Sequence, residues 1–559
     1  MKTIVKASLV TAAALTSANA VSNAALAAKL NSLESELSSI KAKLKKQNKK
    51  LNKVKSHDSN DNIKWGVDFR TEIDYINYDM ADGSTRGKND LMSNRLWLNM
   101  AYAPNPKNVF KGQLSYNKAF GAQFGQNKNP TLTPFGVRGT GFDTFDWISN
   151  EALTDDSIKV RQAYWLYLGD KFFGADIPWT FSIGRRPSTG GFLANLRNDD
   201  AAQSPLGHII NVNFDGLSSK LDLSNVTGVP GMSFKLCMGQ GSTNAAPRLG
   251  NLSATDYQND AQQLEDTKLG GFIFEPYNDG QFIVKTTAFK AFDMPGFDSP
   301  TFFQAFAESQ GAPVGSNGPA GFSQVGNMYG AAISVLVDGL GDDGILADTK
   351  VFGSFAWSKT DPDAGQQMLG LTTPFGVFGA NPGEAKSGTS YWLGTQVPVT
   401  ENGKFGLEYN HGSKYWRSYD YAEDTFAGSK LAARGDAWET YFTYQLTDAL
   451  SAQIRYTSIN YDYTGSNGFF ASGGTPFKIS DIKAGAAQWA QAGGANLTAA
   501  DMGSFIAGTP NGAVQGVIGN LIGAGATQQQ AAIAGLAAAM APSIVEKAQD
   551  VRFYIRYRF

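Results

Sequence analysis

The chain ends on Val551-Arg-Phe-Tyr-Ile-Arg-Tyr-Arg-Phe559, and this stretch decides the fold class most sharply. Successive side chains of a β-strand point to opposite faces, so strict alternation of residue type predicts a strand with two unlike faces. One face is apolar and the other is largely cationic. The apolar face holds Val551, Phe553, Ile555, Tyr557 and Phe559, and the other holds Arg552, Tyr554, Arg556 and Arg558.

A second strand of the same kind is predicted at residues 63–76. Its apolar face holds Ile63, Trp65, Val67, Phe69, Ile73 and Tyr75, and its charged face holds Lys64, Asp68, Arg70, Glu72 and Asp74. This strand alone would also suit a soluble sandwich, in which one face of each sheet meets a core.

The links between strands distinguish these two possibilities. Counting both strands above, the alternation predicts sixteen, at 63–76, 92–103, 108–120, 156–169, 178–187, 209–224, 231–239, 268–276, 281–292, 327–338, 347–358, 388–398, 404–413, 435–446, 450–463 and 549–559. Long and short links alternate through the series, and the short ones have turn chemistry, as in Glu401-Asn402-Gly403. Tight turns on one side and large loops on the other are typical of outer-membrane barrels. We therefore expect an all-β, transmembrane, antiparallel up-and-down barrel of about 16 strands, with 14 to 18 compatible with the pattern.

Composition permits this fold and excludes a helical membrane protein. The mean hydropathy is −0.25, and no run of 18 or more apolar residues occurs in the 559 residues, so a transmembrane helix is excluded. Barrel strands alternate apolar and polar residues, so a low mean hydropathy is compatible with them. The single cysteine, Cys237, rules out an intrachain disulfide.

The N-terminus predicts export and a separate module. Residues 1–20 have the parts of a signal peptide: Lys2 and Lys6, an apolar segment, and a small-residue cleavage site at Ala18-Asn19-Ala20. Residues 21–56 are basic, and apolar residues at heptad spacing from Leu26 to Val54 predict a short coiled coil. Residues 57–559 form the predicted barrel domain, whose charge is acidic.

The coil and the last strand also suggest partners. Four heptads are near the minimum for a stable coil, so we expect matching coils in a homotrimer, contact of the lysines with the anionic cell wall, or a plain spacer. The terminal Phe553, Ile555, Tyr557 and Phe559 resemble the signal that the barrel-assembly machinery reads on its substrates. Outer-membrane lipid would surround the barrel, and no nucleic-acid partner, cofactor or metal is expected.

Several segments resemble the Gram-negative porin superfamily. Arg161-Gln-Ala-Tyr164 is followed by a strand ending in Gly184-Arg185-Arg186, and then by Asn213-Phe214-Asp215-Gly216. Gly184-Arg-Arg-Pro-Ser-Thr-Gly-Gly191 and Tyr409-Asn-His-Gly-Ser-Lys-Tyr-Trp416 resemble a poorly characterised porin-like family. In porins the loop after the Gly-Arg strand folds inward and narrows the pore. The resemblance therefore implies a constriction loop at 188–208, containing Arg197, Asp199 and Asp200.

Alternation also predicts which basic residues face the lumen. These are Arg70, Arg95, Lys159, Arg161, Arg186, Arg455, Arg552 and Arg556. The first, second and last strands become neighbours on closure, so four of these arginines would form one basic wall that sets selectivity. The alternative is that they pair with Asp68, Glu72 or Glu439 and stiffen the wall.

The Ala- and Gly-rich segment 464–548 predicts short helices that cap the mouth, enter the lumen or form a surface site. The three histidines, His57, His208 and His411, form no catalytic or metal-binding motif, so we expect no enzyme.

The leading hypothesis is passive diffusion of small polar solutes or ions. The rival is a plugged or gated barrel acting as an adhesin or as a sleeve around a partner protein.

Overall fold

A computed structural model describes residues 63–120, 158–186, 190–211, 214–241, 267–296, 299, 323–373, 375–420, 425–466, 472–506 and 508–559. The expected signal peptide (1–20) and coiled coil (21–56) lie outside these residues.

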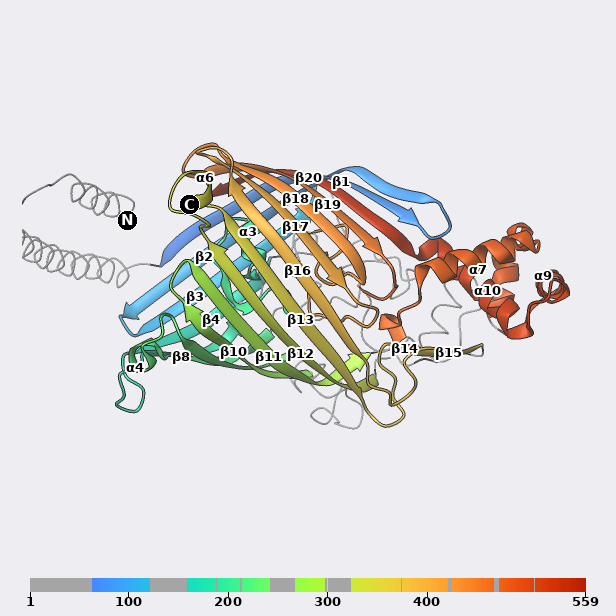
Figure 1. Cartoon of the computed structure of the whole chain (residues 1–559), viewed down its shortest axis with the longest axis horizontal. Helices are drawn as coiled ribbons and strands as arrows, with labels where there is room; N and C mark the ends of the chain where they lie inside the picture. The colour runs from blue at the N-terminus through green and yellow to red at the C-terminus, as the bar shows by residue number, and fades with distance from the viewer. Residues whose placement is uncertain are drawn as a thin grey trace, which may run out of the picture. The chain divides into compact units, whose positions relative to one another are not determined.

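The described residues form a closed barrel of sixteen strands in which each strand pairs with its neighbours in chain order (Figure 1). Every pairing between barrel strands for which a register is given is antiparallel, as in β1 with β2 and β11 with β12. The prediction of an up-and-down antiparallel barrel is therefore confirmed. The strands are β1 (Lys64–Met80), β2 (Thr85–Asn105), β3 (Asn108–Ala119), β4 (Lys159–Gly169), β5 (Trp179–Arg186), β8 (Phe214–Asp222), β9 (Ser233–Gly241), β10 (Thr267–Asn278), β11 (Phe282–Gly296), β12 (Ser323–Asp338), β13 (Lys350–Pro362), β16 (Ser387–Pro398), β17 (Gly403–Gly412), β18 (Gly435–Gln445), β19 (Leu450–Tyr461) and β20 (Val545–Arg558).

The last strand closes the barrel against the first. Arg70 lies opposite Arg556, and Ile73 lies opposite Phe553. The backbone amide of Val67 donates to the Phe559 carbonyl at 3.1 Å, and the Phe559 amide donates back at 3.0 Å. Closure gives every barrel strand a neighbour on both sides, so the barrel sheet has no open edge, as a lipid environment requires.

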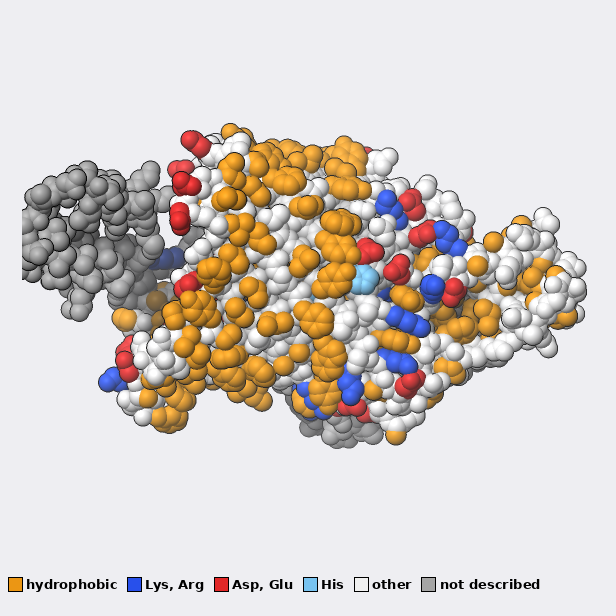
Figure 2. Space-filling model, viewed as in Figure 1, with side chains coloured by type: hydrophobic (Ala, Val, Ile, Leu, Met, Phe, Trp, Pro, Cys, Tyr) orange, Lys and Arg blue, Asp and Glu red, His pale blue; other side chains and the backbone are white. Residues whose placement is uncertain are grey.

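Outer and inner faces of the strands have opposite chemistry. On β1, Trp65 and Tyr75 are exposed, whereas Asp68, Arg70 and Glu72 are buried inside. On β20, the outward Phe553, Ile555 and Tyr557 are each more than 40% exposed. Figure 2 shows hydrophobic side chains over the strands and charged side chains gathered toward the two ends of the barrel. This distribution defines a lipid-facing belt around a hydrophilic interior.

Short and long links are sorted to opposite ends of the barrel. The end that carries the C-terminus has the short links, among them 279–281, 399–402 and 446–449. Two of them hold single-turn helices, α4 (Ser224–Thr227) and α6 (Gly344–Ala347). The opposite end carries long segments such as 363–386, which includes the hairpin β14 (Gly370–Thr373) and β15 (Gly376–Gly379), and 462–544.

The first link differs from the long loop that the sequence suggested. β1 and β2 continue past the expected strand ends and meet in a turn at residues 81–84. Gly83 adopts a φ of 83°, and the Ser84 amide and hydroxyl both donate to the Asp82 carboxylate. Strand pairing outside lipid needs no apolar face, so residue types do not alternate in this polar hairpin. The alternation therefore predicted a first strand that ends too early and a second strand that begins too late.

The Ala- and Gly-rich segment forms helices α7 (Ile479–Gln491), α8 (Ala499–Ile506), α9 (Gly512–Gly523) and α10 (Gln528–Met540). They lie beyond the strand ends and have their own core around Trp489, Phe505 and Val514 (Figure 1). Ile479 and Ile482 join this unit to Ala437 and Ile459 of the barrel. Within the described part of the chain, no helix has the length and hydropathy needed to cross a bilayer.

Candidate functional site inside the barrel

Charged residues of β1, β2 and β20 form a network on the inner face. Arg70 lies directly opposite both Arg95 and Arg556, so closure brings together the residues expected on one wall. Each arginine also meets a carboxylate: Arg70 Nε lies 2.6 Å from Glu72, Arg95 Nη2 lies 3.6 Å from Asp68, Arg552 Nε donates to Asp74 at 2.6 Å, and Arg556 Nε donates to Asp68 at 2.8 Å. All these side chains are almost fully buried. The wall therefore alternates positive and negative charge instead of presenting bare arginines.

One long link enters the barrel, and we call its described residues, 190–211, inward loop A. It contains β6 (Gly191–Phe192), helix α3 (Ala194–Arg197) and β7 (Gln203–Leu206), with β6 and β7 paired in parallel. The end of α3 reaches the opposite wall: Gln396 Nε2 donates to the Leu196 carbonyl at 3.0 Å, and Gln453 Nε2 donates to the Arg197 carbonyl at 2.8 Å. The last carbonyls of a helix lack partners within it, so wall side chains satisfy these groups and fix the loop.

A second segment also packs against the inner wall. We call residues 413–420 and 425–434 inward loop B. Lys430 Nζ donates to Glu408 of β17 at 2.6 Å and also contacts Glu439 of β18. Sequence patterns did not predict this loop, since it lacks periodicity. The two inward loops are paired, because the Ile209 carbonyl accepts from the Tyr419 amide at 2.9 Å.

Glu439 of β18 contacts both inward loops. It accepts two hydrogen bonds from Arg197 Nη1 of loop A, each 3.2 Å long, and one from Thr457 Oγ1 at 2.8 Å. Arg455 Nε lies 3.8 Å away. A carboxylate with three cationic neighbours is strongly stabilised in its charged form.

The acidic residues of loop A meet basic residues of the wall. Asp200 accepts from Arg556 Nη2 and from Arg558 Nη1, both at 2.7 Å, and Asp199 accepts from Lys404 Nζ at 2.7 Å. Arg558, Lys404 and Asp199 keep about 40% of their side-chain surface exposed. Water therefore reaches these charges, unlike those around Glu439.

The remaining basic residues lie on β4 and β5. Arg161 Nη1 donates to Gln113 Oε1 at 2.5 Å and stacks over Trp97. Arg186 Nη2 donates to Ser218 Oγ at 3.0 Å, and Lys159 is half-buried at the start of β4. Both arginines are buried.

His208 of loop A forms hydrogen bonds with two strands of the wall. His208 Nδ1 lies 2.8 Å from Ser354 Oγ on β13, and its Nε2 lies 2.9 Å from Ser390 Oγ on β16. The ring also packs against Trp392 and Trp416, with ring centroids 5.8 Å apart in each case. Complete burial lowers the pKa of the His208 imidazole to about 3, so this residue is neutral at neutral pH and fixes the loop through hydrogen bonds. His411 instead contacts Asp436 at 2.9 Å, and the described residues contain no cluster of three or more metal-type ligands.

A closed antiparallel barrel with a lipid-facing belt, a charged interior and inward loops is a transmembrane β-barrel of porin-like architecture. The chain belongs to the family described as "Protein of unknown function (DUF3373)", which matches residues 85–496. No curated protein matches the chain.

Three solved structures illustrate what this chain resembles. OmpF of Salmonella typhi in complex with daunomycin is 11% identical, covers 90% of this chain and 99% of its own, and has a TM-score of 0.39. OmpT, an outer membrane protein of Vibrio cholerae, is 10% identical, with coverages of 89% and 97% and a TM-score of 0.37. An anion-selective porin from Comamonas acidovorans is 9% identical, with coverages of 89% and 99% and a TM-score of 0.42.

Proposed function

We propose that the chain is an outer-membrane channel that lets small polar solutes or ions diffuse across the membrane. One observation carries this proposal: the barrel has an apolar outer face and an ionisable inner face along the same strands, as on β1. Buried charges are costly unless they are paired or face water. A barrel of this strand number is wide enough for an aqueous passage around inward loops.

Loop A supplies the selective element in this proposal. Asp199 contacts Lys404 and Asp200 contacts Arg558, each at 2.7 Å, and these side chains keep contact with water. A solute passing here would meet both signs of charge within hydrogen-bonding distance of each other, which favours small polar or zwitterionic molecules over large apolar ones.

Sequence patterns at the two ends of the chain add further roles to this proposal. Residues 1–20 would direct export, the coil at 21–56 would join three barrels or reach the cell wall, and the terminal aromatic strand would be read during barrel assembly. These roles follow from sequence pattern alone.

Liposome swelling tests the transport proposal. Liposomes containing the protein are placed in isotonic solutions of neutral sugars and amino acids of increasing mass. The expected result is swelling whose rate falls with solute mass, and Asp200→Asn changes the relative rates of charged solutes. Asp448→Asn, in the exposed turn between β18 and β19, is the matched control. Swelling no faster than that of protein-free liposomes for every solute would contradict the proposal.

A further inference from the structure

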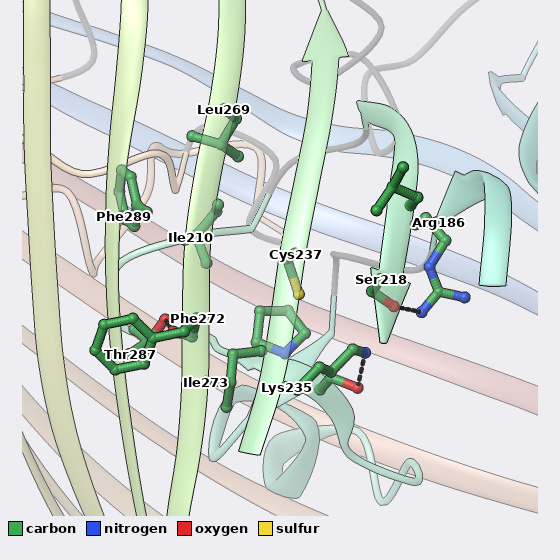
Figure 3. A pocket seen from close by; sticks show the side chains of 14 residues that line it. Arg186, Ile210, Ser218, Lys235, Cys237, Leu269, Phe272, Ile273, Thr287 and Phe289 are labelled. Carbon is green, nitrogen blue, oxygen red and sulfur yellow. Dashed lines mark hydrogen bonds between the residues drawn. The ribbon is translucent and has the colours of Figure 1, made fainter. Parts of the chain in front are cut away.

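A pocket lies between loop A and the inner wall formed by β5 and β8–β11. The space between its lining atoms, open solvent included, is about 580 Å³. Ser204, Pro205 and Ile210 of loop A form one side, and Figure 3 shows the side chains of the wall strands on the other side. None of these residues contacts Glu439, and none takes part in the ion pairs of Asp199 and Asp200.

Two buried cations line this pocket. Arg186 and Lys235 are each only 9% exposed. Arg186 donates to the Ser218 hydroxyl at 3.0 Å, and Lys235 donates to the Ser204 hydroxyl at 2.8 Å (Figure 3). Among the described residues no carboxylate pairs with either, whereas Arg197 and Arg556 each have one. Hydroxyl groups satisfy the donors but do not neutralise the charge.

The sheet places a further positive charge beside them. Lys220 of β8 lies directly opposite Lys235 of β9 in the register. Like charges directly opposite each other destabilise a sheet, and burial increases that cost. An anion between these side chains would remove both penalties.

Apart from Thr287 and Cys237, the other side chains that line the pocket are apolar. Leu269 and Ile273 of β10 and Phe289 of β11 line the wall, and Pro205 and Ile210 face them from loop A. A hydrated inorganic anion would gain nothing from this surface, whereas an anion with a hydrocarbon body would bury apolar area against it.

We propose that this pocket binds a small amphipathic carboxylate. Its carboxylate would lie between Arg186 and Lys235, where the planar guanidinium can donate two parallel hydrogen bonds, and its apolar body would lie against Leu269, Ile273 and Phe289. The site goes beyond the proposed function, since it requires binding but no conduction. Because Ser204 belongs to loop A, the bound ligand would also bridge that loop to the wall.

Isothermal titration calorimetry on the folded full-length protein in an uncharged detergent tests this proposal. The probes are hexanoate, acetate and hexan-1-ol, which separate the contributions of charge and chain. We expect saturable binding of hexanoate, with acetate and hexan-1-ol at least about tenfold weaker, as expected for losing either the apolar contact or a charged hydrogen bond. Equal binding of hexan-1-ol and hexanoate by the wild-type protein would overturn the proposal without any variant.

Variants locate the site. Arg186→Gln with Lys235→Gln should weaken hexanoate binding about tenfold to a hundredfold, and Ile273→Trp should weaken it by filling the pocket while keeping both charges. Lys268→Gln is the control, because this β10 lysine is 57% exposed and does not line the pocket. Wild-type affinity in a double variant that keeps its heat-modifiable gel mobility would show that hexanoate binds elsewhere. Calorimetry requires no current, so failure of this site and failure of the channel proposal are distinguishable.

Discussion

Replacing Glu439 by Gln should destabilise the protein more than any other isosteric change at a carboxylate of the described strands. The carboxylate holds Arg197 of loop A at 3.2 Å, contacts Lys430 of loop B and lies 3.8 Å from Arg455. All these side chains are at most 4% exposed. Glutamine preserves volume but removes the negative charge that Arg197, Lys430 and Arg455 share, while Glu408 still contacts Lys430.

The expected loss follows from the cost of breaking a buried ion pair. Removing one partner leaves uncompensated charge and typically costs about 3–5 kcal/mol. The matched control is Glu546→Gln, which breaks a 2.6 Å pair with Lys483 in which both side chains are more than a third exposed. Such exposed pairs contribute about 0–1 kcal/mol. Urea unfolding in detergent, followed by tryptophan fluorescence, measures both variants against wild type.

Two further results would check the reasoning. Adding Lys430→Met to Glu439→Gln should cost less than the sum of the two single changes, because it removes one of the stranded charges. In bilayers, Glu439→Gln should raise conductance noise, because both inward loops lose a shared attachment. Two results together would refute this account of how the loops are held. Glu439→Gln would be as stable as Glu546→Gln, and the costs of Glu439→Gln and Lys430→Met would simply add in the double variant.

Three other changes have definite expected outcomes. His208 has a folded pKa of about 3, below its unfolded value near 6.5; its contribution to stability is therefore complete above pH 6.5 and is lost as pH falls toward 3, by about 1.4 kcal/mol per pH unit. In His208→Gln the urea midpoint should depend less on pH between 6.5 and 3 than in wild type. Parallel plots of midpoint against pH for the two proteins would count against this role of His208. Replacing residues 479–541 with a flexible linker should leave heat-modifiable mobility intact, because α7–α10 have their own core; an unfolded barrel would show that the helices are needed for closure. Phe559→Ala should lower the yield of assembled barrel in the membrane fraction while purified protein keeps its urea midpoint, since Phe559 is 67% exposed and its backbone makes the closing hydrogen bonds; equal yield would argue against a role as an assembly signal.

The barrel could be predicted from the sequence because lipid and water impose period-two alternation on every strand. All sixteen expected strands are present, and β20 has the apolar face read from Phe553 to Phe559. The predicted strand ends were least accurate where the alternation stops. The expected strand at 209–224 begins at Phe214, because Ile209 and Ile210 belong to loop A, where they pack on the interior.

The interior was only partly predictable. Alternation placed Arg70, Arg95, Arg552 and Arg556 on one face and left pairing with Asp68, Glu72 or Glu439 as an alternative. It did not indicate which arginine meets which carboxylate, nor that Asp74 takes part. Pairing depends on the stagger between strands, which residue spacing within one strand does not contain. Loop B was missed for a related reason: Lys430 and Arg434 form their contacts through tertiary folding of an irregular segment. Arg434, for example, donates to the Trp416 and Gly474 carbonyls.

The central claim, that this barrel conducts small solutes or ions, is tested most directly by single-channel recording of the mature protein in a planar bilayer under a salt gradient. The account predicts discrete conductance steps with a defined reversal potential, in groups of three if the coil joins three barrels, and a shifted reversal potential in Asp199→Asn with Asp200→Asn. A properly folded protein that inserts into the bilayer but passes no current at any voltage, with or without residues 479–541, would contradict it.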